Sequence, residues 1–226
     1  SSSLPEQLVK DAISSAFTSA GQRCSAARVL FVQDDIADKV MHMLAGAMAE
    51  LKVGDPGLLS TDVGPVIDAD ALALLDAHAA KMAKEARLIA TAATDNNAAD
   101  GSVAHGTFFA PRAWELQSLS QLTRENFGPA LHVIRWKAED LDKVCDAIAE
   151  TGYGLTLGIH SRIDETVTRI TRRLGVGNTY VNRNVIGAVV GVQPFGGEGL
   201  SGTGPKAGGP HYLYRFASER TLSVDT

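Results

Sequence analysis

Cys24 is the residue whose type and setting best suit covalent chemistry. It lies in the segment GQRCSAA, residues 21–27, between a predicted helix and a predicted strand. A buried structural thiol is the commoner role of a cysteine. The small neighbours of Cys24 favour a nucleophile instead, because they let backbone amides and a substrate approach a sulfur whose thiolate form must be stabilised. Cys145 lies on an apolar helical stripe and is expected in the core.

Two further segments are candidates for binding. ENFGP, at residues 125–129, would present a carboxylate and an aromatic ring together at a sheet edge, which suits a ribose hydroxyl and a flat ring. A simple solvated turn has the same composition. The glycine-rich segment 194–210 is either a flexible surface loop or a shaped one whose backbone N–H groups meet an anion. It lacks the order of a P-loop, and the chain has no Rossmann fingerprint. The six histidines show no metal-ligand spacing, so no metal site is expected.

Helices and strands alternate along the chain. Apolar residues at three- and four-residue spacing predict helices, and short β-prone runs predict strands. The predicted helices cover residues 4–20, 34–51, 68–86, 138–151 and 163–174. The predicted strands cover residues 29–32, 88–92, 107–109, 131–136, 155–160 and 178–182, and a polar stretch at 95–101 is a predicted surface loop. This alternation predicts one α/β domain over residues 1–226, with a mainly parallel sheet and helices on both faces.

Composition excludes several classes of protein. The chain has 226 residues, 45% of them hydrophobic, and a net charge of −5. These values are those of a globular protein rather than a disordered one. It has no basic run for nucleic acid and no apolar stretch of membrane-spanning length. Two cysteines and no signal peptide predict a cytoplasmic location. Because the chain begins at Ser1 rather than a methionine, we expect it to be part of a longer polypeptide.

The order of the three motifs resembles the aldehyde dehydrogenase superfamily, and the resemblance covers essentially the whole chain. GQRC resembles the nucleophile motif of that family, ENFGP its nicotinamide-ribose contact, and PFGG at 194–197 its substrate-side loop. Residues 152–162, 182–184 and 199–210 are closer still to one branch, bacterial bifunctional proline utilization A. The dehydrogenase module of that branch oxidises L-glutamate γ-semialdehyde, formed from pyrroline-5-carboxylate, to glutamate.

The resemblance implies a role for each site residue. Cys24 would attack the aldehyde and form a thioester after hydride transfer to NAD. Glu125 would hydrogen-bond the nicotinamide ribose while Phe127 packs against the cofactor. The substrate side would be formed by Ser25, Phe195, Ser201 and Gly202. Ser25 and the Ser201-Gly202 backbone would anchor the substrate carboxylate, and the Ser201 hydroxyl would add a donor.

The resemblance also implies partners outside the chain. The NAD-binding half, the oxyanion-hole Asn and the general-base Glu of the family would lie upstream in the same polypeptide, so the isolated chain is expected to be inactive. FAD would belong only to a separate proline dehydrogenase domain, if the parent polypeptide is bifunctional. A homo-oligomer and a peripheral membrane association of the parent are compatible with the family.

Three alternatives remain open at this point. The chain could serve an aldehyde dehydrogenase with another substrate. It could be a Cys-dependent acyl transferase or hydrolase, although neither segment flanking Cys24 contains a histidine to act as base. It could also be an assembly domain without activity, in which residues 215–224 supply an exposed strand to a partner.

Overall fold

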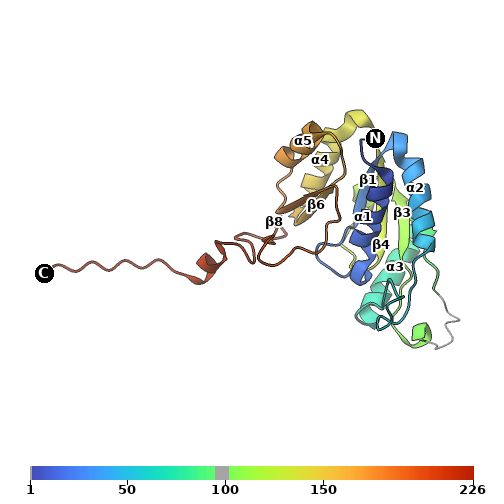
Figure 1. The fold of residues 1–226 in the computed structure, drawn as a ribbon, viewed down its shortest axis with the longest axis horizontal. Coiled ribbons are helices and arrows are strands. Elements are labelled where there is room, and N and C mark those ends of the chain that lie inside the picture. The colour runs from blue at the N-terminus through green and yellow to red at the C-terminus, as the bar shows by residue number, and fades with distance from the viewer. Residues whose placement is uncertain (1, 95–101) are drawn as a thin grey trace.

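The computed structural model describes residues 2–94 and 102–226, and Figure 1 shows their arrangement. The predicted loop at 95–101 lies outside the described residues. The helices are α1 (Pro5–Phe17), α2 (Asp34–Ala49), α3 (Ala69–Glu85), α4 (Leu141–Glu150) and α5 (Asp164–Arg173). The strands are β1 (Val29–Gln33), β2 (Arg87–Thr91), β3 (Arg112–Leu116), β4 (Ala130–Trp136), β5 (Tyr153–Gly154), β6 (Thr156–Ile159), β7 (Asn178–Val181) and β8 (Glu198–Gly199).

Four strands form the main sheet, in the order β1-β4-β3-β2. β4 pairs in parallel with both β1 and β3, while β2 runs antiparallel to β3 at the edge. The predicted α/β class with a mainly parallel sheet is confirmed. The strand predicted at 107–109 is wrong, because none of these residues joins a strand among the described residues, and Thr107 instead exchanges hydrogen bonds with Val66 of a neighbouring loop.

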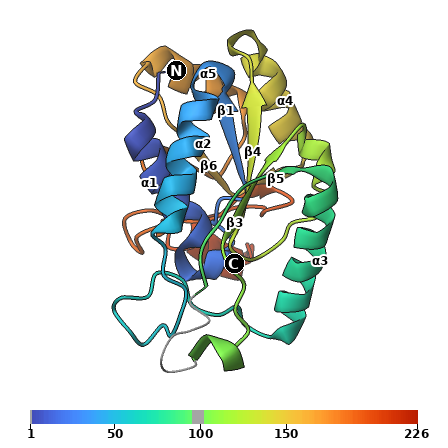
Figure 2. The ribbon, with the colours of Figure 1, turned by 90° about the vertical axis from the view of Figure 1, so that its right-hand side faces the viewer.

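The helices cover the sheet through regular apolar stripes. The buried residues of α2 recur every three or four positions: Ala37, Val40, Met41, Leu44 and Met48. Asp68 precedes α3 and caps it, because its Oδ1 accepts the Ala71 N–H at 2.8 Å. In Figure 2 the strands of the main sheet lie between α2 on one side and α3 on the other. Residues of these helices and strands share one continuous core.

Two small sheets form a second part of the chain, next to the main sheet. β6 pairs in parallel with β7, and β5 pairs antiparallel with β8. The strand predicted at 155–160 corresponds to β6, whereas β5 lies just before it and was not predicted. After a short 3₁₀ turn at Tyr212–Phe216, residues 217–226 have no regular structure and are exposed, and they project from the body in Figure 1.

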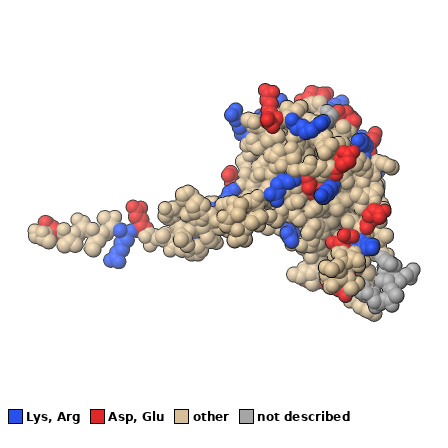
Figure 3. All heavy atoms as spheres, viewed as in Figure 1, with Lys and Arg blue, Asp and Glu red and all other residues tan. Residues whose placement is uncertain are grey.

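The surface carries no single sign of charge on the face drawn in Figure 3, where acidic and basic side chains are interspersed. Within the described ranges, no helix is both long and apolar enough to cross a membrane. No group of three His, Cys, Asp or Glu side chains among the same residues is placed to hold a metal ion.

Candidate active site

A left-handed turn carries the chain from α1 to Cys24. The predicted first helix ends at Phe17 rather than at residue 20, and Ser19, Ala20 and Gly21 follow with φ of 56°, 51° and 63°. Ser19 and Ala20 pay a steric cost of about 1–2 kcal/mol each in this region of backbone space. The turn leaves Cys24 exposed as a free thiol. This accessibility is what a nucleophile requires.

The Cys24 turn is joined to the ENFGP segment by direct contact between two glycines. The Gly128 N–H donates to the Gly21 carbonyl at 3.3 Å. A Cβ added at Gly21 would lie 2.1 Å from the Gly128 carbonyl oxygen. Only glycine therefore allows the two backbones to approach this closely. The structure thus brings together two motifs that are about a hundred residues apart in the sequence.

Arg28 links the two motifs a second time, through its side chain. Its Nη1 donates to the Gly21 carbonyl at 2.6 Å and its Nη2 to the Arg23 carbonyl at 3.1 Å. Its Nε donates to Glu125 Oε1 at 3.1 Å, and its guanidinium carbon lies 4.6 Å from the centre of the Phe127 ring. Burial lowers the pKa of Arg28, while Glu125 opposes this shift. A guanidinium keeps its charge at neutral pH, so Arg28 also presents a cation to Cys24.

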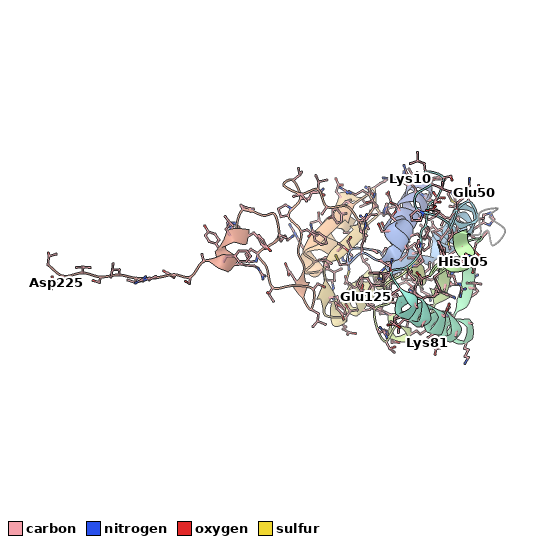
Figure 4. The ribbon with its side chains drawn as sticks, turned by 90° about the horizontal axis from the view of Figure 1, so that it is seen from below. Lys10, Glu50, Lys81, His105, Glu125 and Asp225 are labelled. Atoms are coloured by element: carbon pink, nitrogen blue, oxygen red, sulfur yellow. The ribbon has the colours of Figure 1, made fainter. Side chains whose placement is uncertain are left out.

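Glu125 and Phe127 remain accessible despite these contacts. The Glu125 side chain is 33% exposed and Phe127 is 45% exposed, which is unusual for a phenylalanine. In Figure 4 the labelled Glu125 lies at the surface of the molecule, on the side seen from below. A carboxylate and a ring presented side by side fit a ribose hydroxyl and a planar heterocycle.

The third motif is held in the second part of the chain. The Asn178 side chain accepts the Gly196 N–H at 3.2 Å and donates to the Pro194 carbonyl at 3.0 Å, so it fixes the loop on either side of Phe195. Ser201 Oγ accepts the Gly154 N–H at 3.1 Å. The segment is therefore a shaped loop rather than a flexible one.

Backbone geometry is also restricted at Gly202. Its φ is +150°, and a Cβ there would lie 2.8 Å from the Gly197 carbonyl oxygen. The Gly202 N–H donates at 3.4 Å to the Gly199 carbonyl, which is a long and weak bond. The Gly202 N–H is therefore only weakly hydrogen-bonded within the protein.

Ser25 connects the Cys24 turn to this second part. The side chain of Ser25 is buried, and its carbonyl accepts the Thr156 hydroxyl at 3.4 Å. Ala27 packs against a small apolar cluster formed by Tyr180, Val185 and Ile186. The Cys24 turn is thus connected on one side to Glu125 and Phe127 and on the other to β6 and β7. Asn178 of β7 in turn holds the loop around Phe195.

Sequence reasoning missed Arg28, Asn178 and a pair of buried histidines behind the ENFGP segment. His132 of β4 is 2% exposed and stacks on Trp114 with ring centres 5.7 Å apart. Its Nε2 lies 2.8 Å from Nε2 of His78 on α3. Burial lowers the pKa of His132 to about 4, and it also lowers the pKa of His78. Both imidazoles are consequently neutral at ordinary pH.

This burial predicts an acid-sensitive fold. Above a pH of about 6.5, His132 is neutral in both the folded and the unfolded chain, so it contributes no pH dependence. Between that pH and the folded pKa of about 4, the unfolded chain binds the proton more readily, so stability falls as the pH falls. The difference amounts to about 3 kcal/mol once both states are protonated. Urea unfolding at a series of pH values measures it.

A pair of variants isolates the contribution of His132. His132→Gln lacks the titrating group, so its free energy of unfolding should decline less steeply between about pH 6.5 and 4.5 than that of the wild type. His42→Gln, at an exposed position, should retain the wild-type slope. Equal slopes for all three proteins would contradict the burial argument.

Comparisons with known proteins identify the family of the chain. The sequence model of the aldehyde dehydrogenase family matches residues 4–222. Bifunctional protein PutA of Klebsiella aerogenes is 55% identical over 220 residues, which cover 97% of this chain and 17% of PutA. 1-Pyrroline-5-carboxylate dehydrogenase of Geobacillus sp. (strain WCH70) is 35% identical over 220 residues, 96% of this chain and 41% of that protein.

A solved structure gives the same result for the fold. In a crystal structure of a Bradyrhizobium japonicum proline utilization A (PutA) mutant, the matching region has a TM-score of 0.91 and 58% identity, over 98% of this chain and 22% of that one. The chain therefore spans less than half the length of each of these relatives. The family match over nearly all of its residues confirms the resemblance seen in the three motifs: the chain belongs to the aldehyde dehydrogenase family.

Proposed function

We propose that the chain is the catalytic domain of a longer polypeptide that oxidises L-glutamate γ-semialdehyde to glutamate with NAD. The observation that carries this proposal is the exposed thiol of Cys24, held beside Glu125 and Phe127 by the Arg28 side chain. The higher identity to bifunctional PutA than to pyrroline-5-carboxylate dehydrogenase supports a bifunctional parent. Any FAD would then belong to its separate proline dehydrogenase domain.

The residues of the chain perform the covalent part of the reaction. The Cys24 thiolate forms a bond to the aldehyde carbon, and the resulting oxyanion is stabilised by the Cys24 backbone N–H. NAD, when bound, supplies the acceptor for the hydride that leaves this carbon. The thioester that remains on Cys24 is hydrolysed by water, which releases the carboxylate and regenerates the thiol.

Glu125 and Phe127 are the residues of this chain that would hold NAD. One carboxylate oxygen, Glu125 Oε1, is held by Arg28, which fixes the side chain in place for a ribose hydroxyl. The half-exposed Phe127 ring is held from one side by the Arg28 guanidinium. The rest of the cofactor site is proposed to lie in the upstream half of the polypeptide.

The surroundings of Cys24 favour the nucleophile of an oxidation over the nucleophile of a Cys–His hydrolase. Within residues 2–94 and 102–226, no imidazole hydrogen-bonds to Cys24, so the base of a Cys–His hydrolase is absent from this part of the site. The Arg28 guanidinium, which binds the Gly21 and Arg23 carbonyls of the Cys24 turn, has no acceptor and cannot serve as that base. Both cysteines are free, as expected in a reducing compartment.

The substrate carboxylate is proposed to bind at Ser25, Ser201 and Gly202. Because Ser201 Oγ accepts a hydrogen bond from Gly154, its own O–H hydrogen is available to donate to an anion. The weakly bonded Gly202 N–H adds a second donor. Phe195 would pack against the aliphatic part of the substrate.

Replacing Ser201 with alanine tests both the substrate and the site. A hydrogen bond to a charged group contributes about 1.5–3 kcal/mol. Ser201→Ala in the full-length polypeptide should therefore lower kcat/KM for glutamate semialdehyde about 10- to 100-fold, with little change for propanal. The measurement is NADH formation with each of the two aldehydes.

The neighbouring Thr203→Ala variant is the matched control, because Thr203 is an exposed hydroxyl residue of the same loop. It should leave kcat/KM for both aldehydes unchanged. An equal loss on both aldehydes in Ser201→Ala would mean that the Gly154 contact shapes the site generally. No loss on either would remove the support for a carboxylate-bearing substrate.

A further inference from the structure

The two buried histidines form one hydrogen-bonded chain whose direction is fixed at both ends. His132 Nδ1 lies 2.8 Å from the Arg28 carbonyl oxygen, which can only accept, so Nδ1 carries the hydrogen. In the neutral ring, Nε2 is then an acceptor, and the facing Nε2 of His78 must donate to it across 2.8 Å. His78 Nδ1 is therefore an acceptor in turn.

Asn126 supplies the donor that this acceptor requires. Its Nδ2 lies 3.2 Å from His78 Nδ1 and 3.4 Å from the Arg124 carbonyl oxygen. Since a carbonyl oxygen only accepts, the amide nitrogen is correctly placed as donor to both groups. The chain thus runs from Asn126 through His78 and His132 to the Arg28 carbonyl, with each ring in a single tautomer.

The hydrogen-bonded series ends at the same arginine that contacts the two residues proposed to bind the cofactor. Asn126 stands between Glu125 and Phe127 in the sequence. The Arg28 guanidinium contacts both of these side chains directly. The Arg28 carbonyl is linked to Asn126 through hydrogen bonds of the two imidazoles. Residues 125–127 are therefore fixed from two directions by the same arginine.

Aromatic packing holds both imidazoles in fixed orientations. Trp114 stacks on His132 at an interplanar angle of 17° and meets the edge of His78 at 83°. These contacts restrict both rings to the orientation that the hydrogen bonds require. A buried polar pair is costly unless each of its groups is paired, and here all four ring nitrogens are paired.

We propose that His78 and His132 are positioning residues for NAD: together they hold Asn126, and so set the position of Glu125 and Phe127. This inference rests on the proposed function, in which those two residues contact the cofactor. Neither histidine touches NAD itself. Their effect is carried by the hydrogen-bonded chain alone.

Two variants remove the link to Asn126 from opposite sides. Asn126→Leu has nearly the same shape but no donor, and it changes a residue that is only partly buried. In His78→Gln the amide Nε2 takes the position of the imidazole Nε2 and keeps a donor toward His132. Its acceptor oxygen belongs to the same terminal amide and does not occupy the position of Nδ1 that faces Asn126. In the full-length polypeptide each variant should raise KM for NAD about 5- to 10-fold, the usual effect of one hydrogen bond, with kcat and KM for the aldehyde changed less than about twofold.

The double variant asks whether the two residues act as one chain. Once the link is broken, a second break costs nothing further, so Asn126→Leu with His78→Gln should have the KM for NAD of the single variants. The matched control is Met48→Ala, which lowers stability at a core position that takes no part in these hydrogen bonds. It should leave KM for NAD unchanged.

A third variant separates failure of this inference from failure of the proposed function. Glu125→Ala should raise KM for NAD whether or not the histidines position the loop, and an unchanged KM would overturn the proposed function. If Glu125→Ala raises KM for NAD while Asn126→Leu and His78→Gln do not, only the positioning role is overturned. The same holds if the two single effects multiply in the double variant, or if Met48→Ala raises KM equally.

Discussion

Aldehyde oxidation by the full-length polypeptide is expected to disappear when Cys24 is replaced with alanine. The substitution removes the only atom proposed to bond to the substrate carbon, and loss of such a nucleophile lowers kcat by about 10⁴-fold or more. Because Cys24 is exposed and its turn is held by backbone contacts of Gly21 and Arg23, the variant should fold normally. NAD binding, measured by calorimetric titration, should remain near that of the wild type.

Cys145→Ala provides the matched control for Cys24→Ala. Cys145 is 2% exposed on α4, and burial raises the pKa of its thiol, so it has neither the access nor the ionisation of a nucleophile. Its replacement should reduce stability by about 1 kcal/mol and leave turnover unchanged. Turnover of Cys24→Ala within about tenfold of wild type, a barrier difference of about 1.4 kcal/mol, would refute the assignment of the nucleophile.

Candidate site residues could be predicted from the sequence where they lie together in one short segment. A cysteine among small residues and a carboxylate next to an aromatic ring each predict chemistry without any tertiary information. The glycines at 21 and 128 were visible as turn residues, but their contact with each other was not. Such a contact depends on how α1 and β4 are placed in space, and no local pattern encodes that placement.

Residues that act through distant partners were missed for the same reason. Arg28 is one of many arginines in the sequence, and it becomes informative only when its side chain is seen to join Gly21, Glu125 and Phe127. His78 and His132 are 54 residues apart, and their pairing follows from the packing of α3 against the sheet. A search for metal-ligand spacing could not detect a pair of imidazoles that bind each other.

The errors in the predicted fold have a similar physical origin. β3 was missed because the charged residues Arg112 and Glu115 interrupt the apolar run expected of a buried parallel strand. Glu115 is accommodated there by salt bridges with Arg87 and Arg135 from the two neighbouring strands. These pairings form only when the sheet has assembled, so a window of sequence carries no sign of them.

The close contact between the Cys24 turn and the ENFGP segment leads to the second large effect, that of Gly21→Ala. A methyl group at this position would lie 2.1 Å from the Gly128 carbonyl oxygen and 2.7 Å from that of Ala16, so the two backbones must separate. A displacement of this kind moves the nucleophile relative to Glu125 and Phe127. Misplacement of catalytic groups by about 1 Å can lower turnover about 100-fold, and we expect kcat to fall by about that factor.

Two glycine controls separate the clash from the other consequences of adding a methyl group. Gly187 has φ of +73° with nothing within 4 Å of an added Cβ, so Gly187→Ala should cost about 1 kcal/mol of stability without affecting kcat. Gly46, inside α2, also has open space and an ordinary helical backbone, so Gly46→Ala should raise stability by about 0.5–1 kcal/mol. Thermal unfolding and steady-state turnover of the three variants give the comparison. If Gly21→Ala retains kcat within about threefold of wild type, like the two controls, then close contact between Gly21 and Gly128 is not what positions Cys24 for the reaction.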